Sequence, residues 1–310
     1  MLEKYKSNMT APILVAVVYL LLILSRIIKI TEMTGENEYV GVIVLQLLIF
    51  LLPAVIYSKL KGERYALRLR LRFIGAQQVV VALLAALTLI CGSLLLNILF
   101  ADGMGGDEFS LYNTFTANHN GSAESFLYVT VAYAILPAVC EEFLFRSLLC
   151  AEYEEYGIFT ACLMSSVFFG MIHFNPRQFV IYVFAGVVLF AAMYATRSLL
   201  GSICVHFVYN MYGLFGQSFA NEVYRTTGST ELFLLILSAA LVLFAALFCG
   251  EAARLYRRYS RQNKPSDYLP ARSAKRARSE GKSMEKIAES FLAPPCLACY
   301  LIFVLVTIIA

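Results

Sequence analysis

Long apolar runs alternate with short polar stretches along most of this chain. A helix that crosses a bilayer needs about 20 consecutive apolar residues. Eight runs reach or approach that length, and they lie at residues 11–30, 39–57, 78–100, 126–149, 158–173, 179–194, 199–215 and 232–250. The pattern predicts an all-α fold, a polytopic transmembrane helical bundle with about eight spans. A C-terminal hydrophobic segment follows at 295–310.

The polar stretches between the runs carry charge of alternating sign. Residues 58–72 and 251–293 are rich in lysine and arginine, whereas 31–38 and 101–122 are acidic. Basic loops stay on the cytoplasmic side. We therefore expect an integral membrane protein in the plasma membrane of a prokaryote, with its N-terminus and basic loops in the cytoplasm. The stretch 58–72 is expected either to lie along the headgroups or to form a solvated loop.

Composition narrows the class further. The chain is 60% hydrophobic and 15% charged, whereas soluble domains are about 45–50% apolar and about 25% charged. We divide it into a helical bundle at 1–250, a basic cytoplasmic linker at 251–294 and the hydrophobic segment at 295–310. The eight cysteines are interpreted as small buried hydrophobes. The CxxC spacing of Cys296 and Cys299 favours membrane packing over a zinc or redox site.

Three charges in the fourth apolar run need an explanation, namely Glu141, Glu142 and Arg146. Each ion at the middle of a bilayer costs roughly 2.5–3.5 kcal/mol on insertion scales. Glu142 and Arg146 are four residues apart, so they share a helix face and are expected to pair. Glu141 is rotated by about 100° from Glu142, so it is predicted to be a spare carboxylate. Pro137 is expected to kink this helix.

Further polar residues interrupt other runs. His173 ends the fifth run, and His206 and Asn210 lie four apart in the seventh run, so they share one helix face. Any one of them alone is typical of a hydrogen-bonded packing residue. Together with Glu141, on three different helices, they favour a functional cluster. The third histidine, His119, is expected to be a loop residue.

This set supports two chemistries. In the first, Glu141 acts as general base with His173 to activate a water, and His206 and Asn210 stabilise an oxyanion. In the second, Glu141, His173 and His206 bind a zinc or another divalent metal with one open position, which lowers the pKa of bound water to about 7. The Glu142–Arg146 pair has a supporting role in both.

Three ordered segments, Glu141-Glu142-x-x-x-Arg146, Phe169-x-x-x-His173 and His206-x-x-x-Asn210, carry a family resemblance. They resemble the motifs of the CAAX prenyl endopeptidase type II family, also called CPBP or Abi intramembrane proteases. The resemblance covers residues 126–215. It implies an intramembrane endopeptidase that cleaves a peptide or a lipidated protein, by a metallo or a metal-free glutamate mechanism.

The resemblance also assigns roles to residues. It implies that Glu141 and His173 activate the water, that His206 and Asn210 stabilise the oxyanion, and that a further group is supporting. The supporting group is Glu142, Arg146 and Phe169. Eukaryotic members of the family remove the last three residues of prenylated proteins. Some prokaryotic members are linked to bacteriocin immunity or peptide processing.

Two other functions fit the same residues. A proton-coupled transporter would use Glu141 and the histidines as a relay, but polar residues outside the motifs are sparse in the apolar runs. A non-catalytic immunity or scaffold protein would keep the fold without the reaction. Membrane lipids are expected partners, and nucleic acid is not. Counting of depth along the runs also predicts that the fifth helix begins early, near Tyr153, so that His173 comes level with Glu141.

Overall fold

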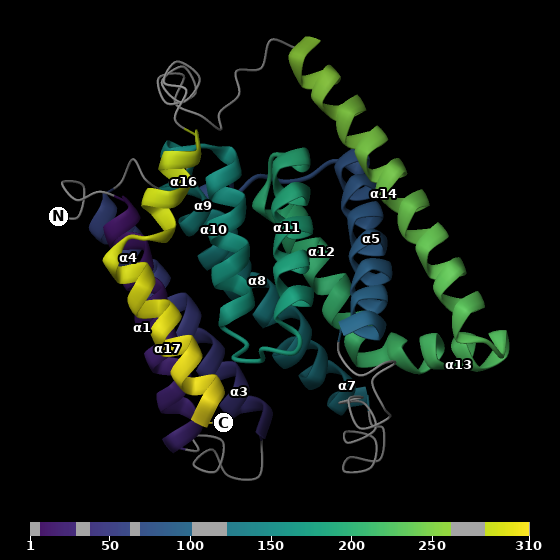
Figure 1. The fold of residues 1–310 in the computed structure, drawn as a ribbon, viewed down its shortest axis with the longest axis horizontal. Coiled ribbons are helices and arrows are strands. Elements are labelled where there is room, and N and C mark those ends of the chain that lie inside the picture. The colour runs from purple at the N-terminus through teal and green to yellow at the C-terminus, as the bar shows by residue number, and fades with distance from the viewer. Residues whose placement is uncertain (1–6, 29–37, 63–68, 101–122, 262–282, 310) are drawn as a thin grey trace.

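The computed structural model describes residues 7–28, 38–62, 69–100, 123–261 and 283–309. Every regular element in these ranges is helical, and the helices pack side by side in one bundle (Figure 1). Seven helical stretches are long and apolar enough to cross a membrane, or eight if one bent pair counts as a single span. The prediction of an all-α polytopic bundle is therefore confirmed. The predicted loops at 31–37 and 101–122, with His119, lie outside the described residues.

The first three spans follow the predicted runs closely. They are α1 (Ser7–Ile28), the continuous stretch α3 (Glu38–Gln46), η2 (Leu47–Leu51) and α4 (Leu52–Lys61), and then α5 (Ala76–Phe100). The middle piece η2 is a π-helix. The helix ends are set by the change from apolar to polar residues, which is why the sequence located them well.

The fourth span contains two π-helical segments. It runs through α7 (Ala123–Val129), η5 (Thr130–Ile135), α8 (Leu136–Glu142), η6 (Phe143–Leu149), α9 (Cys150–Tyr153) and η7 (Glu154–Tyr156). The π-helix η5 ends just before Pro137, which lies in the first turn of α8. A proline removes one backbone donor, and a change of helical pitch beside it accommodates that loss. Glu141 and Glu142 end α8, and Arg146 lies in η6.

The second half of the chain completes the bundle. Its elements are α10 (Ile158–Met171), α11 (Phe179–Thr196), α12 (Leu199–Met211), η8 (Tyr212–Gly216), α13 (Gln217–Thr227), α14 (Thr230–Arg261), α16 (Ser283–Phe291) and α17 (Pro294–Ile309). Helix α14 continues to Arg261, so the first part of the stretch predicted as a linker is helical. Near the other end of that predicted linker, residues 283–291 form α16.

The expected early start of the fifth helix is wrong. Helix α10 begins at Ile158 and has 14 residues, fewer than a full span needs. The preceding Gly157 has φ = 119°, a conformation that only glycine adopts without strain. Gly157 therefore breaks the chain between η7 and α10, and His173 lies at the far end of a short helix.

The bundle has a central group of helices and two flanks. Helix α10 packs on α11, and α11 and α12 pack on α5, while α14 lies along the outer side of α5 (Figure 1). On the other flank α17 packs against α1. Cys296 and Cys299 are both fully buried, and the Cys299 thiol donates to the Pro12 carbonyl of α1 at 3.3 Å. The buried thiols agree with the packing interpretation of the CxxC spacing.

Two cations of the basic stretch 58–72 are buried, which corrects the expectation of a solvated or headgroup-lying segment for them. Lys61 Nζ lies 2.7 Å from Glu152 Oε2, and Arg70 pairs with Glu154. Burial lowers the pKa of the Arg70 guanidinium, but the facing Tyr194 and Glu154 raise it above its usual range. Acidic residues of α9 and η7 are thus the partners of these two cations. Nothing local in the sequence links the two, because the paired residues are 91 and 84 positions apart.

Candidate active site

Glu142 is the centre of the buried polar cluster. Its Oε1 lies 3.2 Å from Arg146 Nη1 and 3.0 Å from His206 Nδ1. Glu142 and Arg146 are both fully buried. The predicted pairing of Glu142 with Arg146 is therefore present. The contact with His206 was not predicted, because it depends on how α12 packs against α8.

Arg146 joins three helices. Its Nη2 donates to the Gly186 carbonyl in α11 at 3.2 Å, and its guanidinium lies 4.3 Å from the centre of the Phe169 ring in α10. Glu142 Oε2 and Arg146 Nε have no hydrogen-bond partner among the described residues. The two buried charges are thus balanced mainly by each other and by the aromatic face. Loss of either partner would leave an uncompensated ion.

The absence of a side chain at Gly186 lets α11 lie close to α10, and a substitution at this position tests that close approach. A Cβ at Gly186 would lie 2.7 Å from the Ser166 Cα in α10, whereas a Cβ at Gly250 in α14 would meet nothing within 4 Å. Gly186→Ala is therefore expected to push α10 and α11 apart and lower the unfolding free energy by about 1–3 kcal/mol. Gly250→Ala is expected to have no such cost. Thermal unfolding of the two purified variants checks this; equal melting temperatures would contradict the close approach.

Glu141 lies next to this cluster and is separate from the ion pair. It is 7% exposed, and it interacts electrostatically with His206, Glu142 and Arg146. Within the described residues its carboxylate makes no hydrogen bond or ion pair. The carboxylate can therefore accept a proton without first losing a hydrogen bond to one of these residues.

His173 is held in a defined orientation at the end of α10. Its Nδ1 lies 3.0 Å from the Phe169 carbonyl oxygen. A carbonyl only accepts hydrogen bonds, so Nδ1 carries a proton, and in the neutral imidazole Nε2 then keeps a lone pair. The imidazole also stacks on the Tyr182 ring of α11, with the ring centres 3.7 Å apart and an interplanar angle of 13°. The tautomer and the plane of the ring are thus both fixed.

The Phe169 ring is where the three sequence motifs meet. Its centre lies 5.3 Å from that of His173 and 5.8 Å from that of His206, both edge to face. The Arg146 guanidinium covers the same ring. Phe169 therefore brings together η6, α10, the turn that follows α10, and α12.

Asn210 lies on the same face of α12 as His206, but it contacts a different element. Its Nδ2 donates to the Ala134 carbonyl in η5 at 3.4 Å. The π-helical stretch η5 alters the usual backbone bonding, which allows a side chain to reach one of its carbonyls. Asn210 is thus attached to the fourth span near the cluster.

Tyr182 is the residue that the sequence did not reveal. Its ring stacks on His173, and its hydroxyl donates to Gln178 Oε1 at 2.7 Å. A tyrosine in an apolar run gives no signal that distinguishes it from packing residues. Only the tertiary contact of α11 with the end of α10 identifies it.

The predicted metal ligands do not form a metal site in the described part of the chain. No three His, Cys, Asp or Glu side chains there are grouped so that they could hold one ion. The donor set Glu141, His173 and His206 is therefore not arranged around one ion within the described residues.

The fold and site define a class, a polytopic helical membrane protein with a buried glutamate, arginine and histidine cluster between its spans. Residues 123–212 match the family model described as Rce1-like, the type II CAAX prenyl endopeptidase family. The match contains every predicted site residue and confirms the resemblance drawn from the three motifs. It covers less than a third of the chain. No curated protein and no solved structure matched the chain.

Proposed function

We propose that this chain is an intramembrane endopeptidase of the CAAX-processing type that hydrolyses a peptide bond with a water activated by Glu141 and His173. The observation that carries this proposal is the meeting of the three motifs on Phe169, beside the Glu141 carboxylate, which makes no hydrogen bond or ion pair within the described residues. The family match agrees with a peptidase at the family level. The proposed substrate is a peptide or a lipidated protein, with a prenylated peptide as the first to test.

The proposed reaction begins with a water between Glu141 and His173. Glu141 takes one proton from the water, whose oxygen attacks the carbonyl carbon of the scissile peptide bond. His173 Nε2 has the lone pair to accept a hydrogen bond from the same water. When the C–N bond breaks, the proton on Glu141 passes to the leaving nitrogen. The new carboxylic acid gives its remaining proton to the amine, so the products are a carboxylate and an ammonium group.

The oxyanion requires donors that are fixed in advance. His206 Nδ1 lies 3.0 Å from Glu142 Oε1, and this contact fixes the orientation of the imidazole. The proposed donor to the developing oxyanion is an N–H at His206 Nε2. Asn210 lies one turn further along α12 and supplies the second proposed donor. Glu142 is therefore proposed to position His206 as well as to neutralise Arg146.

The proposed orientation follows from charge. Lys61, Arg70 and the arginines of α14 gather at one end of the bundle, and basic residues stay on the cytoplasmic side. We place this end in the cytoplasm, with the plasma membrane of a prokaryote as the expected location. Accessibility labelling of single cysteines at the two ends of α14 in intact cells tests this orientation.

A cleavage assay tests the activity itself. Purified full-length protein in lipid vesicles is incubated with prenylated peptides, the same peptides without the prenyl group, and bacterial leader peptides. We expect cleavage near the lipidated end, and the reaction is repeated with a metal chelator. Unchanged cleavage with chelator supports the metal-free route, whereas loss that added zinc restores contradicts it. Proton-coupled uptake without any cleavage would instead favour a transporter.

Tyr182 is predicted to position His173. Tyr182→Phe keeps the stacked ring and loses only the bond to Gln178, so cleavage is expected to stay within a few-fold of wild type. Tyr182→Leu removes the flat surface behind the imidazole, and a small misplacement of a catalytic group costs on the order of 10²-fold. Measurement of kcat for both variants checks this. Equal kcat values for Tyr182→Leu and wild type would contradict the role.

A further inference from the structure

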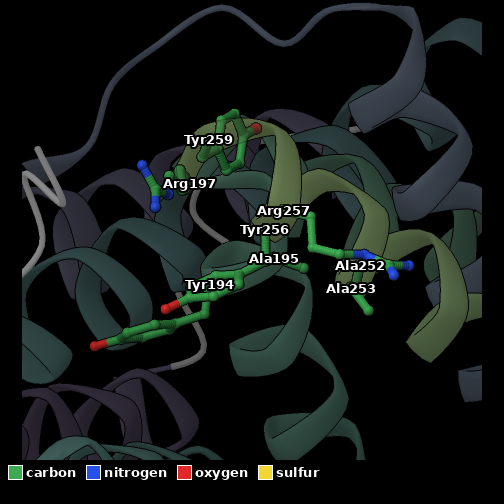
Figure 2. Close-up of a pocket in the computed structure, with 8 residues that line it drawn as sticks. All are labelled: Tyr194, Ala195, Arg197, Ala252, Ala253, Tyr256, Arg257 and Tyr259. Atoms are coloured by element: carbon green, nitrogen blue, oxygen red, sulfur yellow. The ribbon is translucent and has the colours of Figure 1, made fainter. Parts of the chain in front are cut away.

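Two adjacent pockets at the basic end of the bundle are not used by the proposed reaction. One has a volume of about 580 Å³ and lies between α11 and α14, where Tyr194, Arg197, Tyr256, Arg257 and Tyr259 are among its lining residues (Figure 2). The other has about 530 Å³ and is lined by Gln77 and four arginines. Those arginines are Arg254, Arg257, Arg258 and Arg261. Arg257 lines both pockets, so the two adjoin each other, and together they are called the basic surface.

The charge of this surface is one-sided. Of the described residues that line the two pockets, five are arginines and none is a carboxylate. Arg254 pairs with Glu251, which does not line either pocket, and Arg258 donates to Gln77. Within the described residues Arg257 makes no hydrogen bond or ion pair. The surface therefore has positive charge available for an anion.

Part of the surface is already ordered. Arg197 has φ = 55° at the end of α11, and its guanidinium lies 4.3 Å from the centre of the Tyr259 ring. The Tyr259 hydroxyl accepts from Gln78 Nε2 at 2.9 Å. Figure 2 shows Arg197 beside Tyr259 on one side of the pocket and Arg257 on the other. The two guanidinium groups thus border the pocket from different helices.

The position of the surface indicates what kind of anion it meets. It lies where the spans of α5, α11 and α14 reach the same end of the bundle, at residues 76, 196 and 261. Arginine and tyrosine are typical of the headgroup level of a bilayer. Small side chains, Ala195, Ala252 and Ala253, line the larger pocket and leave it open.

One face of α14 changes from apolar to basic along its length. Leu243 and Leu247 are followed on the same face by Arg254, Arg258 and Arg261, at spacings of three, four or seven residues. Leu243 is 55% exposed and Leu247 is 45% exposed. A phospholipid has the same order, apolar chains followed by a phosphate. A soluble phosphate would use the arginines and leave the leucines without a partner.

We propose that this surface is a binding site for the phosphate headgroup of an anionic phospholipid, whose acyl chains lie along the exposed face of α14. Arg257, which lines both pockets, contacts the phosphate. Arg197 and the three tyrosines of the larger pocket lie around the headgroup. The site is separate from Glu141 and His173 and does not depend on the peptidase reaction. The anionic lipid would hold the outer helix α14 against α5 and α11.

The test uses the full-length protein in nanodiscs of equal parts phosphatidylcholine and phosphatidylglycerol, with retained lipid measured by native mass spectrometry. We expect wild type to retain phosphatidylglycerol in preference to phosphatidylcholine. Arg257→Gln should lower that retention about fivefold and Arg257→Gln with Arg261→Gln about 25-fold, from the usual contribution of one basic residue at an anionic surface. Arg257→Lys should keep most of it.

Arg225→Gln is the matched control, because Arg225 is exposed in α13, at the opposite end of α14 (Figure 1). It should retain lipid as wild type does. Equal retention by wild type and the double variant would overturn the proposal, as would an equal loss in Arg225→Gln. Inorganic phosphate is added at constant ionic strength as a further arm. Displacement of phosphatidylglycerol by phosphate alone would show a soluble-phosphate site and would also overturn it.

Discussion

Glu141→Gln is expected to lower the rate of peptide hydrolysis by a factor on the order of 10²–10⁴, the usual contribution of a general base. Glutamine has the same shape but does not accept the proton of the attacking water. Because Glu141 makes no bond to the ion pair beside it, the variant should insert and fold like wild type. Steady-state cleavage of the best peptide, together with a melting curve, measures both effects.

Glu222→Gln is the control for the loss of a carboxylate, since Glu222 is exposed on α13, away from the described cluster. It should cleave at the wild-type rate. A Glu141→Gln variant that cleaves as well as wild type would show that Glu141 is not the base. An inactive Glu141→Gln variant with a lowered melting temperature would show instead that Glu141 is structural.

Glu142→Ala and Arg146→Ala are each expected to lower the free energy of unfolding by about 3–5 kcal/mol, because each leaves a buried charge without its partner. Both side chains are fully buried, and Glu142 also contacts His206. The yield of folded protein and its thermal unfolding in detergent measure the effect. Wild-type yield and stability for both variants would contradict the structural pairing.

Two further variants separate folding from activity. Arg254→Ala removes one partner of the exposed pair with Glu251, and exposed pairs contribute only about 0–1 kcal/mol, so its stability should hardly change. The double variant Glu142→Leu with Arg146→Met removes both buried charges and is expected to recover much of the stability. It should still be inactive, because His206 has lost the carboxylate that positions it.

The hydrophobic pattern determined the number and approximate limits of the spans, because bilayer thickness sets a minimum length for each apolar run. The apolar run that begins at residue 158 also matches the start of α10, whereas the depth count that extended this helix back to Tyr153 was wrong. The chain is instead interrupted at Gly157, whose positive φ ends one helix and starts the next. The sequence shows a glycine in a polar turn, but it does not show which backbone conformation that glycine adopts.

The sequence by itself determined the membrane class, the Glu142–Arg146 pair and the residues that match the family motifs, because helix periodicity and the cost of buried charge act over a few neighbouring positions. Only the tertiary structure decided which helices meet. It paired His206 with Glu142, stacked Tyr182 on His173, joined Lys61 to Glu152, and placed Arg197 beside Tyr259. These contacts join residues far apart in the chain, and packing between helices rather than local pattern brings them together.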